Sequence, residues 1–431
     1  MPRAPSDDGS GDRPRNDDRP DAERGGRRLR ADGGHPGGSG PTGGPPAGHP
    51  SGSDGPPSGH PGGDPTGESG HPHGDAGESS HPERDYDERP LLVTWEATQA
   101  CALACDHCRA DARPDRHPDE LSTARGKDLI DQVAAFGDPA PIFVFSGGDP
   151  MERPDLLELI DYASDRLPTA VTPAPTPTLT AEDVHDLADA GARRMALSLD
   201  GPTAERHDGF RGEEGSFAAV ERAAAAAEEV GLSIQINTTV TGRTAEDLPE
   251  IADLVEDMGA AMWEVFFLVP TGRGTELDQL SPERAEEVME WLYRRSRDAP
   301  FRTITVEAPR YRVVAERVAD ELGDEIRGPV GTTRAGKGFV FVNHLGEVYP
   351  SGFLPASAGN VRDVELPEAY RSSEFFRKLR DPDHFTGPCG DCPHRDVCGG
   401  SRSRAAATTG DPFGSDQLCL RVKQATEANR P

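Results

Sequence analysis

Apolar segments alternate with amphipathic segments between residues 91 and 269, and this alternation restricts the fold more than any other feature of the sequence. Strands are predicted at residues 91–95, 142–145, 169–172, 194–199, 232–240 and 263–269, with helices between them at residues 122–136, 154–166, 181–190, 217–230 and 248–258. Strands joined through helices require right-handed crossovers, which produce a parallel sheet. The predicted class is therefore α/β, as either a partial (β/α)6 TIM-like barrel or a doubly wound sheet. In both architectures ligands bind at the carboxyl ends of the strands.

The first 80 residues contain only two large apolar side chains, Met1 and Leu29, and consist mainly of Gly, Pro, Ser, Asp and His. Such a segment buries too little apolar surface to offset the entropy that is lost on ordering. We therefore predict a disordered tail over residues 1–88. Several of its histidines each precede a proline, and we interpret them as solvated residues rather than as metal ligands.

The chain carries 76 acidic and 46 basic residues, which gives a formal net charge of -30. A field of this sign repels nucleic-acid phosphates and anionic lipid surfaces, so we expect neither nucleic acid nor a membrane as a partner. No apolar run reaches the length of a membrane span, and the first residues lack the apolar segment of a signal peptide. The abundant Asp, Glu and Ala with sparse Lys resemble a haloarchaeal protein, and we expect a cytoplasmic location.

Beyond the sixth predicted strand the pattern changes. An amphipathic helix is predicted at residues 282–298 and a strand at residues 303–307, and residues 338–350 then form a β-hairpin pattern that turns at Leu345 and Gly346. A hairpin in place of another helix–strand unit indicates a second architecture. We therefore predict three parts, which are the tail at residues 1–88, an α/β core at residues 89–325 and a smaller domain at residues 326–431.

Seven cysteines fall into two groups, and in a cytoplasmic protein they are expected to be reduced and available to metal. One group follows the first predicted strand and the other lies near the end of the chain, and their members are Cys101, Cys105 and Cys108, then Cys389, Cys392, Cys398 and Cys419. Three thiolates at the first spacing can bind three corners of a four-iron cluster and leave the fourth iron open to a chelating substrate. A fragment of a zinc site and three unrelated buried thiols are the alternatives.

A glycine turn directly follows the second predicted strand. Gly147 and Gly148 allow the main chain to come close to a ligand, and Asp149 and Pro150 complete the turn. A Gly-Gly turn by itself predicts only a tight loop. Because this turn lies one β/α unit after the three-cysteine loop, we interpret the two segments as parts of one site.

The three-cysteine loop and the glycine turn together resemble radical S-adenosylmethionine (SAM) enzymes, in which the methionine amine and carboxylate of SAM occupy the open iron. In that family a Gly-Gly-Glu-Pro turn binds the SAM amino group, and here Asp149 stands in place of the usual Glu. The resemblance implies that the three cysteines hold a catalytic 4Fe-4S cluster. It also implies contacts to SAM from residues near the strand ends and beside the third cysteine, namely His107, Gly147, Gly148, Asp149, Thr172, Ser198, Asp200 and Asn237. Taken singly, such polar residues are more often helix caps or satisfied core groups.

The four carboxyl-terminal cysteines have two interpretations. Paired thiols followed by a later pair describe a structural zinc ribbon. The spacing and the Cys-Gly-Gly-Ser-Arg run that begins at Cys398 also resemble the SPASM or twitch extension of radical SAM enzymes. That resemblance implies one auxiliary 4Fe-4S cluster with all four thiols as ligands. Full SPASM domains hold a second auxiliary cluster, but Ser351 stands where one of its cysteines is often found, and no cysteine is left over.

The family resemblance implies that SAM is cleaved reductively to a 5′-deoxyadenosyl radical, which abstracts hydrogen from a substrate. Electrons would come from reduced ferredoxin or flavodoxin, and the auxiliary cluster would transfer electrons to or from the substrate. The Trp-Glu-Ala-Thr-Gln-Ala-Cys opening is most similar to oxidoreductases that act on tetrapyrrole side chains in heme and d-type heme synthesis. A peptide-modifying SPASM maturase, similar to those of the pyrroloquinoline quinone pathway, is one alternative. A non-catalytic iron–sulfur electron carrier is another, although it would need neither an open iron nor a glycine turn.

Overall fold

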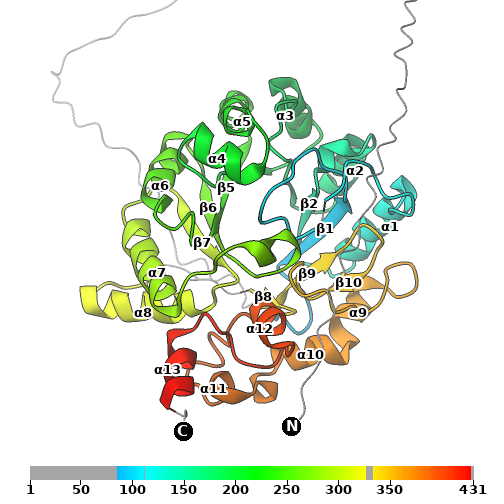
Figure 1. The fold of residues 1–431 in the computed structure, drawn as a ribbon. Coiled ribbons are helices and arrows are strands. Elements are labelled where there is room, and N and C mark those ends of the chain that lie inside the picture. Colours follow the sequence, from blue (N-terminus) through cyan, green and yellow to red (C-terminus); the bar gives the residue numbers. More distant parts are fainter. Residues whose placement is uncertain (1–84, 111, 327–332, 429–431) are drawn as a thin grey trace, which may run out of the picture. The chain divides into compact units, whose positions relative to one another are not determined.

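A computed structural model describes residues 85–110, 112–326 and 333–428, so most of the predicted disordered tail lies outside the described residues. The central element is a ten-stranded sheet in which nine strands follow the order β10-β9-β1-β2-β3-β4-β5-β6-β7, while β8 pairs with β9 (Figure 1). Strands β1 to β7 pair in parallel, and β9 continues the parallel sheet on the other side of β1. The predicted α/β class and partial barrel are therefore confirmed.

All six predicted core strands form, and the strand predicted at residues 303–307 extends the same sheet. The strands are β1 (Leu92–Thr98), β2 (Ile142–Gly147), β3 (Thr169–Val171), β4 (Arg194–Ser198), β5 (Ser233–Val240), β6 (Met262–Phe267), β7 (Arg302–Val306), β8 (Arg334–Ala335), β9 (Gly338–Val342) and β10 (Val348–Tyr349). Because successive strands point the same way, their carboxyl ends gather at one edge of the sheet.

Helices connect the parallel strands as the alternation predicts. They are α1 (Thr123–Ala134), α2 (Leu156–Ser164), α3 (Ala181–Asp189), α4 (Ala204–Arg211), α5 (Ser216–Val230), α6 (Leu248–Asp257), α7 (Pro282–Ser296) and α8 (Arg310–Leu322), with 3-10 turns at η1 (Pro150–Glu152) and η2 (Gly272–Glu276). The Ser122 side chain accepts a hydrogen bond from the Arg125 N–H, which confirms it as the N-cap of α1. Helix α4 is short and mostly polar, so its sequence lacks the apolar stripe that identifies a helix.

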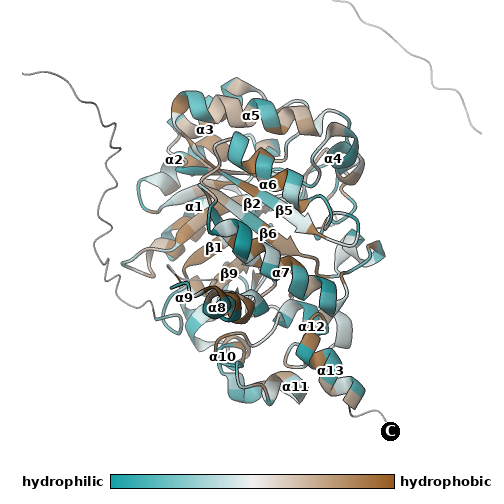
Figure 2. Ribbon diagram, turned by 90° about the vertical axis from the view of Figure 1, so that its left-hand side faces the viewer, coloured by the Kyte–Doolittle hydropathy of each residue, from teal (hydrophilic) through white to brown (hydrophobic). Residues whose placement is uncertain are grey.

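The core lies between the sheet and these helices. Trp95 on β1 is fully buried and packs against Phe143 and Phe145 of β2, and Trp263 of β6 is fully buried farther along the sheet. Figure 2 shows hydrophobic residues on the strands and mixed hydrophobic and hydrophilic residues on the covering helices. Among the described helices, none has both the length and the apolar character needed to cross a membrane.

The predicted hairpin forms from β9 and β10, which pair antiparallel. Its first strand also pairs with β1, because the outer edge of β1 needs a backbone partner, and so it extends the barrel sheet instead of beginning a separate one. The predicted boundary between residues 325 and 326 stays a prediction. Short helices follow at α9 (Leu366–Ser372), α10 (Glu374–Arg380), η3 (Pro382–His384), α11 (Gly387–Gly390), α12 (Arg402–Thr409) and α13 (Leu420–Ala428), of which α13 contacts α7 (Figure 1).

Candidate functional site

The three-cysteine loop leaves the carboxyl end of β1 and folds back on itself. The Cys101 N–H donates to the Arg113 carbonyl (2.9 Å), and the Cys108 N–H donates to the Cys105 carbonyl (3.2 Å). Cys101 and Cys105 are buried, Cys108 is partly exposed, and none is in a disulfide. All three line one cavity of about 240 Å³. The loop therefore brings three reduced thiols to a single wall.

The glycine turn packs directly against the start of the cysteine loop. The Gly148 N–H donates to the Thr98 carbonyl (2.8 Å), and the Asp149 N–H donates to the Ala100 carbonyl (2.6 Å). A Cβ added to Gly148 would lie 2.3 Å from the Ala100 oxygen, and one added to Gly147 would lie 2.5 Å from the Thr98 oxygen. No larger residue fits at either position, and both glycines line the cavity. The two sequence motifs therefore form one structural unit.

Three of the predicted polar residues at the strand ends line the same cavity, namely Thr172, Ser198 and Asn237. Ser198 and Asn237 are direct partners in the register of β4 and β5. The Asn237 Oδ1 accepts a hydrogen bond from Gln235 Nε2 (2.8 Å), which fixes the orientation of the amide. Thr239, which the sequence did not single out, lines the cavity two residues farther along β5.

The two predicted aspartates do not line the cavity but lie behind its wall. The Asp149 carboxylate accepts hydrogen bonds from the Met151 and Ala174 N–H groups, both at 3.1 Å, and burial raises its pKa to about 6. It thereby ties the glycine turn to the segment after β3. Asp200 is buried and pairs with Arg211 at 2.5 Å. Burial alone would raise the pKa of Asp200, but the Arg211 charge, two nearby histidines and the hydrogen bond from the Thr239 N–H together outweigh burial and lower it.

His107 presents a flat, neutral aromatic surface at the cavity. Its ring stacks on Phe210 with centroids 4.7 Å apart and planes 11° apart. Burial lowers the pKa of His107 to about 4, so the imidazole is uncharged at neutral pH. His107 lines the cavity beside the third cysteine, and its contact to SAM stays a prediction.

Two arginines that the sequence analysis did not identify also line the cavity. Arg211 lies at the end of α4, and its Nη1 donates to the Cys105 Sγ over 3.7 Å. Arg109 directly follows the third cysteine and pairs with the buried Glu96 of β1 at 3.0 Å. The position next to Cys108 is a signal that could have identified Arg109. No local pattern identifies Arg211, because its contact to Cys105 joins residues 106 positions apart.

The environment of the triad fits an iron–sulfur cluster held by thiolates. Burial raises the pKa of Cys101 to about 12, and the neighbouring thiols add to this shift. A metal centre would hold such thiols in the thiolate form. The Leu103 N–H already donates to the Cys101 Sγ (3.3 Å), and Arg211 reaches Cys105. Hydrogen bonds of this kind to sulfur are a recurrent feature of iron–sulfur sites.

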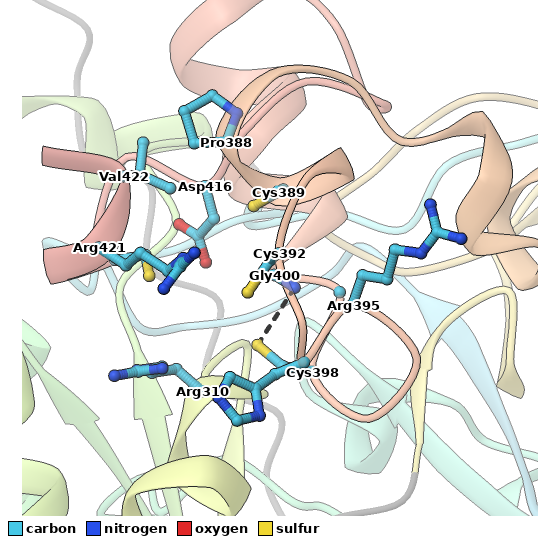
Figure 3. Close-up of a pocket in the computed structure, with 13 residues that line it drawn as sticks. Arg310, Pro388, Cys389, Cys392, Arg395, Cys398, Gly400, Asp416, Arg421 and Val422 are labelled. Carbon is cyan, nitrogen blue, oxygen red and sulfur yellow. Dashed lines mark hydrogen bonds between the residues drawn. The ribbon is translucent and has the colours of Figure 1, made fainter. Parts of the chain in front are cut away.

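The four carboxyl-terminal cysteines line a second pocket beside α11 and α13, shown in Figure 3. Cys389 lies in α11, Cys392 and Cys398 lie in the following turns, and Cys419 immediately precedes α13. The sulfur atoms of Cys389, Cys392 and Cys398 point toward a shared space, next to Asp416 and the guanidinium of Arg421. The sequence grouping of these four residues is therefore also a spatial grouping.

This second pocket is enclosed more tightly than the first, with a volume of about 20 Å³. The Gly400 N–H donates to the Cys398 Sγ (3.4 Å), and burial raises the pKa of Cys398 to about 12. Within the described part of the chain, no three His, Cys, Asp or Glu side chains surround one point closely enough to hold a single metal ion. Four cysteine thiols are a ligand set of both structural zinc sites and four-iron clusters.

A hydrogen-bond network centred on the partly buried Glu307 lies between the two cysteine regions. Glu307 follows β7 and has a φ of 56°, the one positive φ of a non-glycine residue among those described. Its carboxylate accepts hydrogen bonds from the hydroxyls of Ser351 (3.1 Å), Ser401 (2.5 Å) and Ser403 (2.7 Å). Ser351 is close to Phe353 of the first cavity, and Ser401 is close to Cys398 of the second. Backbone strain of this kind persists only where the surroundings hold it.

The fully buried Arg404 adds a second connection through the same network. Its guanidinium donates to the carbonyls of Phe267 (2.9 Å), Leu268 (3.1 Å) and Glu307 (2.9 Å), and it pairs with Asp416 at 3.3 Å. Phe267 and Leu268 line the first cavity, whereas Asp416 lines the second pocket. The two cysteine regions are therefore held together by side chains from both.

Comparison with known proteins places the fold and the site in context. Residues 95–255 match the model of the radical SAM superfamily. The AdoMet-dependent heme synthase of Oleidesulfovibrio alaskensis is 40% identical over 76% of this chain and 86% of its own length. The Fe-coproporphyrin III synthase of Methanosarcina barkeri is 30% identical over 78% of this chain and 89% of its own.

Solved structures share the fold at lower sequence identity. Streptococcus suis SuiB, in a crystal structure with S-adenosylmethionine bound, superposes with a TM-score of 0.62 at 17% identity. The superposition covers 77% of this chain and 78% of SuiB. The likeness extends beyond residues 95–255 and supports the observed partial barrel.

Proposed function

Since the chain belongs to the radical SAM superfamily, we propose that it cleaves SAM reductively to begin hydrogen abstraction from a tetrapyrrole side chain in heme synthesis. The observation that carries this proposal is the convergence of three thiols and the glycine turn on one cavity at the carboxyl ends of the strands. The 40% identity to a heme synthase favours a tetrapyrrole over a peptide substrate.

Cys101, Cys105 and Cys108 would hold three irons of a 4Fe-4S cluster, with the fourth iron open to SAM. Cluster and SAM, when bound, supply the electron and the 5′-deoxyadenosyl radical that abstracts hydrogen from the substrate. The Leu103 N–H and the Arg211 guanidinium stabilise the negative charge on two of the three sulfurs. This stabilisation shifts the reduction potential of the centre.

SAM would lie along the strand-end residues of the cavity. The His107 ring, held flat by Phe210, suits the adenine. Ser198 and Asn237, side by side on β4 and β5, offer hydrogen bonds to the ribose and carboxylate. Arg211, fixed by Asp200, offers a cation to the carboxylate. The carbonyls of the glycine turn would accept from the amino group.

The remaining wall is apolar and would keep water away from a reactive radical. Residues 266–269 after and within β6 contribute this surface, and Phe353 contributes to it from the segment after β10. Exclusion of water prevents side reactions at the site. An apolar wall also suits a flat, aromatic macrocycle.

Cys389, Cys392, Cys398 and Cys419 would hold an auxiliary 4Fe-4S cluster. Four protein ligands leave no iron open to a substrate, and the small volume of the pocket agrees with this closed arrangement. The region is therefore suited to electron transfer, to or from the substrate radical. Reduced ferredoxin or flavodoxin is the proposed electron donor to the enzyme.

The test is anaerobic reconstitution followed by turnover. About eight irons per chain are expected for two cubane clusters. The reduced protein should release 5′-deoxyadenosine from SAM, and iron coproporphyrin III should be consumed with a change in its side chains, measured by mass spectrometry. Release of 5′-deoxyadenosine without change in any porphyrin, but with modification of a peptide, would contradict the substrate assignment. Zinc in place of the second four irons would contradict the auxiliary cluster.

A further inference from the structure

The charged side chains that line the first cavity are both basic, although the protein is strongly acidic. The chain has 76 acidic and 46 basic residues, yet the described residues that line this cavity include Arg109 and Arg211 and no Asp or Glu. The acids that balance these arginines, Glu96 and Asp200, are buried behind the wall. Two guanidinium groups therefore face the ligand space. Such an arrangement favours anionic ligand groups.

The two arginines serve different parts of the cavity. Arg211 contacts Cys105 and lies with the residues proposed to bind SAM. Arg109 is anchored to β1 through Glu96 and to β9 through Phe341. In the sheet order β9 and β1 are separated from β4 and β5 by two strands, so Arg109 is on the side away from Ser198 and Asn237. Arg109 is therefore left for a ligand other than SAM.

The Arg109 guanidinium is held in a fixed plane before any ligand binds. Its centre lies 4.5 Å from the centroid of the Phe341 ring, while a Cβ on Gly352 would lie 3.1 Å from its Nε. Its Nη2 donates to Glu96 (3.0 Å) and its Nη1 to the Gly352 carbonyl (3.3 Å). The side chain keeps 21% of its surface exposed. A pre-oriented guanidinium has five N–H donors, so hydrogen-bonding capacity remains toward the cavity.

Glu96, the acid that pairs with Arg109, is itself held in place by a second contact. The other oxygen of Glu96 lies 2.8 Å from the His344 Nδ1, and both side chains are buried. The hairpin that carries Phe341 and His344 thus meets the cysteine loop at Arg109. A residue with this support can bind a carboxylate without the cost of first ordering its own side chain.

We propose that Arg109 binds a carboxylate of the substrate and so selects a carboxylate-bearing macrocycle. This inference rests on the proposed function and adds the group by which the substrate is recognised. The apolar wall at Leu268 and Phe353 receives the ring system, and Arg109 receives an anionic side chain at its edge. Guanidinium–carboxylate pairs combine charge with directional hydrogen bonds, and the acid is discriminated from its neutral ester by this contact.

The experiment compares two probes on four forms of the reconstituted enzyme, with SAM present and no reductant. The probes are iron coproporphyrin III, with free propionates, and its methyl ester, which is neutral at the same positions. Equilibrium dialysis gives the Kd of each probe for the wild type, Arg109→Gln, Arg109→Lys and the control Arg113→Gln. Arg113 is exposed on the same loop and is outside the cavity lining, so the control makes the same charge change away from the site.

The wild type and the control should bind the acid about 10- to 100-fold more tightly than the ester, as expected for a hydrogen bond between charged groups. Arg109→Gln should reduce this ratio to about one, and Arg109→Lys should retain part of it, because lysine keeps the charge but not the planar geometry. Iron content and SAM affinity should be the same in all four proteins.

Each other outcome is decisive. An acid-to-ester ratio that is unchanged in Arg109→Gln overturns the role of Arg109 and leaves the proposed function standing. A wild type that binds the two probes equally overturns it as well. A wild type that binds neither probe contradicts the tetrapyrrole assignment and the inference together, whereas release of 5′-deoxyadenosine would still report intact SAM chemistry. If Arg109→Gln loses iron and Arg109→Lys does not, the lysine variant decides the question. A reduced acid-to-ester ratio in Arg109→Lys then supports the role of Arg109, and an unchanged ratio overturns it.

Discussion

The two cysteine regions differ in what surrounds their thiols. Cys101, Cys105 and Cys108 lie on one loop beside a cavity of about 240 Å³ lined by polar strand ends. The four later cysteines line a pocket of about 20 Å³ together with charged neighbours such as Arg310, Asp416 and Arg421. The first region is a larger, open cavity with polar groups around it, and the second is a small pocket closely surrounded by its own thiols. In the proposed function, ligand number and enclosing volume are what distinguish the reactive centre from the electron-transfer centre.

The largest expected effect separates the two regions by their role in SAM cleavage. Cys105→Ala should abolish release of 5′-deoxyadenosine, because the triad then cannot hold a cluster with one open iron. Replacement of all four later cysteines by alanine should preserve that release and abolish substrate turnover. Chromatographic measurement of 5′-deoxyadenosine and product, with iron content as the control, tests both. Complete turnover by a folded four-alanine variant would contradict the electron-transfer role.

The next largest effect is expected on stability, from the Glu307 hydrogen-bond network that joins the two cysteine regions. Glu307→Ala should lower the free energy of unfolding by about 2–4 kcal/mol, because three serine hydroxyls lose their acceptor and all three serines are buried. Ser403→Ala, which removes one hydroxyl, should cost about 1 kcal/mol. Urea unfolding of the reconstituted proteins gives both values.

The Glu307→Ala variant also tests whether the network between the two cysteine regions matters for turnover. If Glu307 aligns the loop of Phe353 with the loop of Cys398, Glu307→Ala should release more 5′-deoxyadenosine per product than the wild type. Glu307→Gln keeps the size of the side chain and should lie between the two. An unchanged ratio in a destabilised variant would show that the network supports folding only.

The free energy of unfolding should depend on pH because of Glu264, a carboxyl in the barrel interior beneath the first cavity. Burial raises the pKa of Glu264 on β6 to about 7, although Arg194 and Arg302 oppose the shift. An acid whose pKa rises on folding contributes stability that is complete below its ordinary pKa of 4.5 and is lost as pH rises through about 7. Between acidic and alkaline conditions, the free energy of unfolding of the wild type should therefore fall by about 1–3 kcal/mol more than that of Glu264→Gln. A pH-independent difference in urea unfolding would contradict this assignment.

The smallest expected effect concerns the aromatic surface at the triad. His107→Ala should weaken SAM binding by about 3- to 10-fold, the contribution expected of one aromatic stacking contact. His107→Phe should retain the affinity, because the ring is uncharged and acts through its face. Equilibrium dialysis with labelled SAM measures both. Equal loss in the two variants would indicate that a ring nitrogen, rather than stacking, contacts the ligand.

Sequence patterns predicted the parts of the site that depend on short-range spacing. The cysteine loop, the glycine turn and Ser198 with Asn237 follow from strands that end at one edge of a parallel sheet. Asp149 and Asp200 also belong to strand ends, but their carboxylates turn into the wall to satisfy backbone N–H groups and Arg211. Strand alternation predicts that a residue is near an edge and does not predict which way its side chain turns.

Features that depend on long-range contacts were not predictable. Arg211 reaches Cys105 from a short polar helix that has no apolar stripe, and Glu307 meets serines from two distant segments. The hairpin was predicted as the start of a new architecture, yet β9 pairs with the outer edge of β1. An unpaired strand edge leaves N–H and C=O groups without partners, and β9 supplies those partners.

The most direct test of the account is electron paramagnetic resonance of the reduced protein with and without SAM. Two reduced 4Fe-4S signals are expected, and SAM should change only the one that is lost in Cys105→Ala. The signal lost in Cys398→Ala should stay unchanged. A SAM-dependent change in the Cys398 signal, or the absence of any change in the Cys105 signal, would contradict the assignment of the open iron to the three-cysteine loop.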